Sequence, residues 1–203
     1  MRTIAMLGLL ALAGCGGGVG PRPTVVISNE FTPAQVALVE EGVTSWTALV
    51  PDLRPTIAVR DAGQAWDEAL AHPEPNTVYV LPVHGPEGYC PRVGPINHGA
   101  DPTYRSYTSY LAITDAPVHE SWAVTCIDIG AAGLDRIGAD GFPLPPDEMR
   151  GTAAHELGHA LGLPHSATRG DVMFGDVRGQ AIAPTCDDAR AMAEHLGVAA
   201  SCS

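Results

Sequence analysis

Basic residues are scarce in this chain of 203 residues. It has 11 Lys and Arg residues against 23 Asp and Glu residues, which gives a formal net charge of −12 at pH 7. Proteins that bind the phosphate backbone of nucleic acids concentrate Lys and Arg, so this balance argues against a nucleic acid as partner. Hydrophobic residues make up 45% of the chain, and this length and content predict one domain with its own core.

The apolar run near the N-terminus is too short to span a membrane. Residues 4–13 fall short of the roughly 20 that a spanning helix needs, but with Arg2 before them they have the pattern of a secretory signal. The junction Leu12-Ala13-Gly14-Cys15 resembles a bacterial lipobox, in which the chain is cut before a lipid-carrying cysteine. We therefore predict a lipoprotein signal peptide at 1–14, a lipid on Cys15, and an exported protein anchored in the bacterial cell envelope only through that lipid. An ordinary signal peptide with an incidental cysteine is the alternative.

The stretch after the signal is rich in glycine and proline. Residues 16–23 cannot build a helix or a packed strand, so 15–23 is predicted as a flexible tether and 24–203 as the folded domain.

No C-x-x-C pair is present among the remaining cysteines, which argues against zinc binding by thiolates. Cys90, Cys126, Cys186 and Cys202 are an even number in an exported chain, which favours disulfides, and four cysteines allow three connectivities. We predict a Cys186–Cys202 bond, because the two flank a predicted C-terminal helix, and Cys90–Cys126 by elimination.

Residue patterns predict strands and helices in alternation. β-Branched and apolar runs predict strands at 24–28, 56–60, 77–83, 110–114 and 122–129. Thr32-Pro33 begins a helix whose apolar face carries Val36, Val39, Val43, Trp46 and Leu49. Further helices are predicted at 64–71 and 187–196, and a long surface loop at 84–108. The order predicts an α+β fold of mixed α/β layers.

Residues 155–165 have the spacing H-E-x-x-H-x-x-G-x-x-H. Two histidines four apart on a helix share one face, so His155 and His159 can reach the same ion, with Glu156 beside it. A left-handed Gly162 would end the helix and bring His165 back toward the metal. Three nitrogens leave a fourth position open, which is typical of catalytic rather than structural zinc.

This ligand set predicts one catalytic Zn²⁺ and hydrolysis of peptide bonds in a protein or peptide substrate. Zinc would activate a water, and Glu156 would act as general base and then as general acid. A cell-envelope binding lipoprotein that keeps zinc only for stability is the alternative, and the intact Glu156 argues against it.

Other candidate ligands carry less information. Asp128, Asp135 and Asp140 could offer carboxylates to Ca²⁺, but their spacing matches no EF-hand loop, so solvated turn residues are the favoured interpretation. The remaining histidines fit no ligand pattern and are interpreted as loop or surface residues: His72, His84, His98, His119 and His195.

With Met173 downstream, the histidine motif resembles the metzincin clan of zinc endopeptidases. Within that clan it is most similar to the matrixins, which commonly have a serine after the third histidine, as Ser166 is here. The resemblance covers residues 153–174. It implies a monomeric catalytic domain with a mostly parallel twisted sheet, a zinc-binding helix, a methionine turn with Met173 as an apolar floor, and a C-terminal helix. Gly175 stands where astacin- and serralysin-like members have a tyrosine ligand, and the matrixin Pro-x-Tyr pocket wall and cysteine-switch prosegment are missing. Substrate preference therefore does not carry over.

Overall fold

The computed structural model describes residues 19–60, 73–82, 89–90, 94–95, 106–112, 121–127, 145–175 and 179–202. Its largest element is a five-stranded sheet with the order β2-β1-β3-β7-β6. The strands are β1 (Thr24–Ser28), β2 (Thr56–Arg60), β3 (Thr77–Pro82), β6 (Ser106–Ala112) and β7 (Ser121–Ile127). Four of them run parallel, and β6 pairs antiparallel with β7 at one edge. A separate antiparallel pair joins β4 (Tyr89–Cys90) and β5 (Gly94–Pro95).

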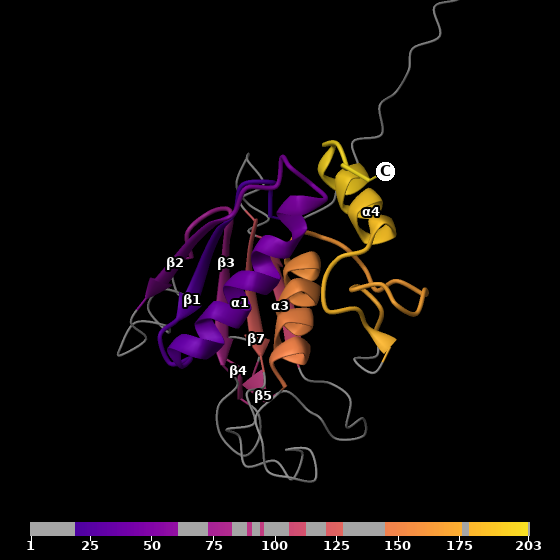
Figure 1. Cartoon of the computed structure of the whole chain (residues 1–203). Coiled ribbons are helices and arrows are strands. Elements are labelled where there is room, and N and C mark those ends of the chain that lie inside the picture. Colours follow the sequence, from indigo (N-terminus) through magenta and orange to yellow (C-terminus); the bar gives the residue numbers. More distant parts are fainter. Residues whose placement is uncertain are drawn as a thin grey trace, which may run out of the picture.

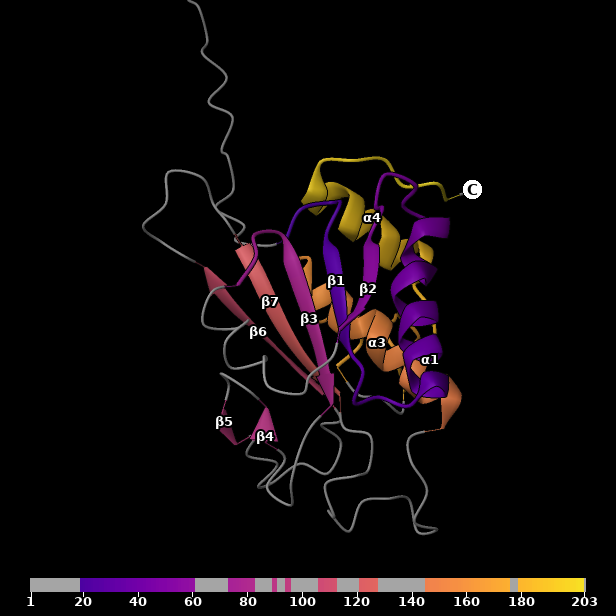
Figure 2. The same ribbon diagram turned by 90° about the vertical axis from the view of Figure 1, so that its left-hand side faces the viewer.

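Two helices pack side by side on one face of this sheet (Figure 1, Figure 2). They are α1 (Pro33–Ser45), which continues into the 3-10 turn η1 (Trp46–Ala48), and α3 (Pro146–Ala160). Another helix, α4 (Cys186–Leu196), lies at one end of α3 (Figure 1). The arrangement confirms the predicted mixed α/β fold with a mostly parallel sheet.

The core lies between the sheet and these helices. Alternate strand residues face it, because successive side chains of a strand point to opposite faces. The helices contribute Val39, Val43 and Trp46, as predicted, and Leu157. Fully burying one such aliphatic side chain contributes about 1.5–3 kcal/mol. The inward strand residues are Val25, Ile27, Val78, Val80, Ala123 and Ile127. This packing fixes α3 against β6 and β7.

Most predicted elements are confirmed within two residues. The exception is the strand predicted at 110–114, which begins at Ser106 and ends at Ala112. The stretch 84–108 is also not one irregular loop, because β4, β5 and the start of β6 lie within it. These strands are defined by their partners, as each residue of β6 pairs with one of β7. The helix predicted at 64–71 lies outside the described residues.

The predicted flexible tether is wrong for residues 19–23. Val19 is 1% exposed, and its N–H donates to the Ala160 carbonyl oxygen over 3.3 Å. The carbonyl oxygens of Pro21 and Pro23 accept from the N–H groups of Arg54 and Thr56 over 2.9 Å each. The partners lie far along the chain, so the local composition does not reveal them. The folded part therefore already includes Val19.

The cysteines also differ from expectation. Cys186 and Cys202 are free thiols, so the predicted bond between them is wrong here. The Cys202 thiol instead donates to the carbonyl oxygen of Cys186, with 3.7 Å between the two atoms. Cys126 is buried and disulfide-bonded. The side chain of Cys90 lies outside the described residues, so the predicted Cys90–Cys126 pairing stays a prediction.

Within the described ranges, no helix is long and apolar enough to cross a membrane. Several residues that were interpreted from the sequence alone lie outside those ranges, so the structure does not test their predicted roles: Cys15, Asp128, Asp135, Asp140, His72, His84, His98 and His119.

Candidate metal centre

The helix that carries the first two histidines has a clear beginning and end. α3 starts with Pro146, followed by Asp147 and Glu148, whose charges suit the positive end of the helix dipole. At its other end the N–H groups of Gly162 and Leu163 donate back to carbonyl oxygens of the last turn, over 2.8 and 2.9 Å. The φ of Gly162 is +102°, which confirms the predicted left-handed turn. The chain then reverses toward the helix.

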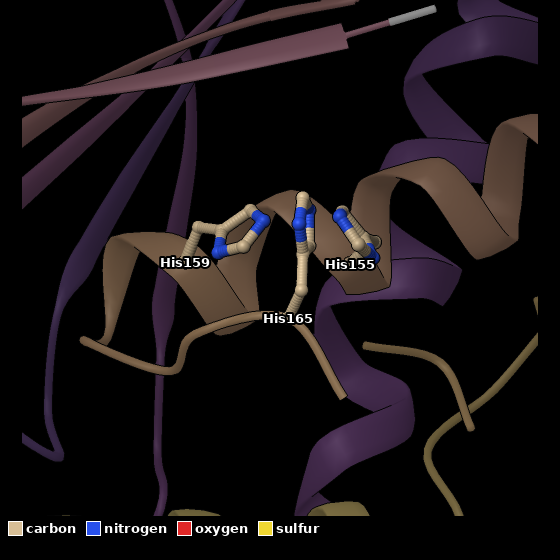
Figure 3. Close-up of side chains that lie close together, drawn as sticks. All are labelled: His155, His159 and His165. Atoms are coloured by element: carbon tan, nitrogen blue, oxygen red, sulfur yellow. The ribbon is translucent and has the colours of Figure 1, made fainter. Parts of the chain in front are cut away.

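This reversal brings His165 to the two helical histidines, and the three rings point toward one another (Figure 3). The ring centroids of His155 and His159 are 4.6 Å apart, and that of His165 lies 5.2 and 4.7 Å from them. One nitrogen from each ring lies within 4.8 Å of the others. The three residues predicted as zinc ligands therefore form one cluster.

Hydrogen bonds set the tautomer of two of the rings. His155 Nδ1 lies 2.7 Å from the Val172 carbonyl oxygen, and His159 Nδ1 lies 2.7 Å from that of Leu163. A carbonyl oxygen only accepts, so both Nδ1 atoms carry the proton and donate. The Nε2 atoms keep their lone pairs, which is the state that a metal ion requires.

Burial also favours the neutral form of two rings of the cluster, those of His155 and His165. Burial lowers the pKa of His155 below its ordinary value of 6.5, although the Glu156 carboxylate and the Val172 hydrogen bond oppose the shift. Partial burial of the ring lowers the pKa of His165 as well, together with the nearby His159. Neutral imidazoles are the protonation state that binds zinc.

Glu156 is buried next to the first ligand, with 3% of its surface exposed. Its charge acts on the rings of both His155 and His165. The carboxylate is thus close to the cluster, as the motif predicts for a residue that serves the same metal.

Met173 lies beneath α3, where the helix has a glycine. Met173 is 1% exposed, and a Cβ on Gly158 would come within 2.3 Å of its sulfur atom. The same Cβ would lie 3.2 Å from the Trp46 ring. Only a glycine allows so close an approach, so Met173 packs against α3 at Gly158, which lies between His155 and His159 in the sequence. Its role as an apolar floor of a metal site stays a prediction.

Sequence patterns missed the residue that holds the backbone of Met173. Asp188 of α4 is 3% exposed, and its carboxylate accepts from the N–H groups of Val172 and Met173 over 2.8 and 3.1 Å. It also takes part in the capping box of α4 with Thr185. The T-x-x-D spacing signals such a cap, but not the second pair of bonds.

Trp46 was predicted only as a core residue. Its Nε1–H donates to the carbonyl oxygen of Ala154 over 2.9 Å, between positions 108 residues apart. The bond fixes α3 one residue before His155, and no local pattern predicts it.

A known protein family matches the part of the chain that contains this site. Residues 120–196 match the Matrixin family model (Peptidase_M10). The matched stretch is less than half of the chain, but it holds all three histidines, Glu156 and Met173. The chain is therefore similar to matrixins across the metal centre.

No curated protein matches the sequence. Among solved structures the chain is similar to High choriolytic enzyme 1, a hatching enzyme zinc-protease from Oryzias latipes (Medaka fish). The sequence identity is 17% and the TM-score 0.30, over 78% of this chain and 50% of that one. The chain thus spans half of that enzyme's length, and so loose a likeness says nothing about activity.

Proposed function

We propose that this chain is a zinc-dependent endopeptidase of the matrixin-like kind. The observation that carries the proposal is the cluster of His155, His159 and His165, with two rings held in the tautomer that leaves Nε2 free. Three imidazoles suit zinc and leave a coordination position for a water or a substrate oxygen. When bound, zinc supplies Lewis acidity, which makes a water more acidic and polarises the peptide carbonyl group.

The residues of the chain then carry the proton. Glu156 takes a proton from the attacking water, the new carbon–oxygen bond forms, and the peptide carbon–nitrogen bond breaks as Glu156 gives the proton to the leaving amine. His155 and His159 keep their orientation through their carbonyl partners. Protein or peptide substrates follow from this chemistry.

Replacing the proposed base tests the function. In Glu156→Gln, cleavage of unfolded protein substrates should fall by about 10²- to 10⁴-fold, while zinc stays bound. Glu194→Gln is the matched control, because Glu194 is an exposed residue of α4. Full cleavage in Glu156→Gln would reject the mechanism. Zinc-loaded protein that cleaves nothing in a broad peptide library would favour the non-catalytic binding lipoprotein.

We also propose that the protein is exported and anchored through a lipid on Cys15. Support comes only from the signal-like N-terminus and its lipobox-like junction. An extended chain from Cys15 to Val19 reaches at most about 14 Å, so the anchored domain would lie next to the membrane. Mass spectrometry of the mature protein should show a lipid-modified Cys15 at the N-terminus, and Cys15→Ser should release the protein from membranes. A mature chain with unmodified Cys15 would remove this part of the proposal.

A further inference from the structure

The rings of the three proposed ligands are not held in place equally by hydrogen bonds. The rings of His155 and His159 each donate a hydrogen bond to a backbone carbonyl group, and both residues belong to α3. His165 is exposed and follows the helix, and among the described residues its ring has no hydrogen-bond partner. The orientation of His165 therefore depends on the backbone that carries it.

That backbone is fixed at the next residue, Ser166. Its N–H donates to the Met173 carbonyl oxygen over 2.7 Å. Its hydroxyl group donates to Asp171 Oδ2 over 2.6 Å and accepts from the N–H of Thr168 over 3.0 Å. A short bond from a hydroxyl group to a carboxylate is among the stronger hydrogen bonds in proteins. Ser166 thus holds the segment that carries the third ligand.

Asp171 connects this segment with the rest of the site. It is 6% exposed, and its Oδ1 atom accepts from the hydroxyl group of Thr185, the N-cap of α4, over 2.9 Å. Its own carbonyl oxygen accepts from the N–H groups of Phe174 and Ala181, over 3.2 Å each. One buried residue therefore ties the segment after His165 to the methionine turn and to α4.

We propose that Asp171 is a positioning residue for the third ligand, acting on His165 through Ser166. This inference rests on the proposed zinc function. α3 places two nitrogens by itself, but the third reaches the metal only if the segment after Gly162 returns to the same place each time. Without the carboxylate, the Ser166 hydroxyl group loses its acceptor and His165 can take other orientations. Partners that orient metal ligands typically change metal affinity by about 10- to 100-fold.

Zinc affinity of the full chain, measured by competition with a chelator, tests the proposal. The dissociation constant should rise by about 10- to 100-fold in Ser166→Ala and in Asp171→Asn. The double variant should lose no more zinc affinity than the single variant that binds zinc more weakly, because both changes break the same hydrogen bond between Ser166 and Asp171. Two exposed positions give matched controls, Ser201→Ala and Asp187→Asn, and these should stay within about twofold of the unchanged chain.

Cobalt substitution gives a readout that needs no turnover. The visible spectrum of bound Co²⁺ reports ligand number and geometry, and it should change in Ser166→Ala and Asp171→Asn but not in the controls. Ser166→Thr, which keeps the hydroxyl group, should restore both affinity and spectrum. Unchanged affinity and spectrum in both variants, or losses that add fully in the double variant, would overturn the proposal.

Thermal unfolding of the metal-free proteins separates loss of folding from loss of binding. Should Asp171→Asn fail to fold, Ser166→Ala decides alone, since Ser166 is only half-buried. A chain that binds no zinc at all would reject the proposed function. A chain that binds zinc and cleaves peptides, with both variants equal to it, would reject only the positioning role.

Discussion

Position 162 requires a glycine for two separate structural reasons. Its φ of +102° lies in the left-handed region, where a residue with a Cβ costs about 1–2 kcal/mol. A Cβ there would also lie 2.2 Å from the Nε2 atom of His195 on α4, closer than packing allows. His195 is exposed, as predicted, yet its ring covers the turn that leads to His165.

Gly170 allows strain and clash to be measured separately. Its φ is +97°, but a Cβ there would meet nothing within 4 Å. Gly170→Ala should therefore lower the free energy of unfolding by about 1–2 kcal/mol through strain alone. Gly162→Ala should lose the same amount and about 0.5–1.5 kcal/mol more, because the exposed His195 ring must move away from the new Cβ. Urea unfolding of the metal-free proteins measures both losses.

Removal of the His195 ring isolates the clash. In the Gly162→Ala background, His195→Ala should restore part of the lost stability, whereas in the Gly170→Ala background it should restore none. Equal losses at the two glycines, or no recovery without the ring, would contradict this account.

At the level of elements, α4 shows what the sequence reveals and what it does not. Helical spacing predicts a packing helix from Ala189, Met192, Ala193 and Leu196. The first three are buried, and Leu196 is partly buried against the core. The same spacing gives no sign that Asp188 is buried as well, because its partners are N–H groups 15 and 16 residues earlier. A pattern can identify the apolar face of a helix, but hydrogen-bond partners across the fold depend on how the elements pack.

Asp188→Ala should destabilise the protein strongly. The change leaves the N–H groups of Val172 and Met173 without their acceptor and removes part of the α4 cap, so we expect a loss of about 2–4 kcal/mol in urea unfolding. Asp187→Ala is the matched control: it removes an exposed carboxylate whose ion-pair partner among the described residues is the exposed Arg190, and it should cost no more than about 1 kcal/mol. Similar losses in the two variants would mean that Asp188 acts only through its charge at the helix start.

Local sequence patterns predicted several other elements and residues, whereas partners across the fold determined those that were missed. β1 and β2 have β-branched sequences and begin and end where predicted. β6 begins earlier than predicted because Ser106 is a strand residue through its pairing with Ile127, not through its own preference. The three histidines were predictable because their geometry follows from a helix and one glycine turn. Asp171 and Trp46 were not, because their partners come from other elements.

In the whole molecule, the two ends of the described chain lie against the helical layer. The N–H of Val19 donates to the Ala160 carbonyl oxygen, which would otherwise lack a partner at the end of α3. Near the C-terminus, the N–H of Ser201 donates to the Leu49 carbonyl oxygen over 2.7 Å. The segment 19–23 therefore supports the end of the helix that carries His155 and His159.

Asn76 holds this N-terminal segment in place. Its Oδ1 atom accepts from the N–H of Gly20 over 2.7 Å, and its Nδ2 atom donates to the Arg22 carbonyl oxygen over 2.6 Å. Its φ of 54° is positive, so a change to glycine keeps the backbone conformation and removes only these side-chain bonds. Asn76→Gly is therefore a cleaner test than Asn76→Ala, which would add backbone strain.

In Asn76→Gly, we expect a loss of about 1–3 kcal/mol in the free energy of unfolding, from two hydrogen bonds and one added glycine. The amide proton of Gly20 should exchange faster in native-state hydrogen exchange, while those of Val26 and Ile27 in the middle of β1 change only by the global loss. Unchanged exchange at Gly20 would mean that burial of Val19 and the backbone hydrogen bonds of the segment fix it without Asn76. Val19→Ala separates the two contributions, because it keeps both Asn76 bonds and removes only buried apolar surface from the end of α3.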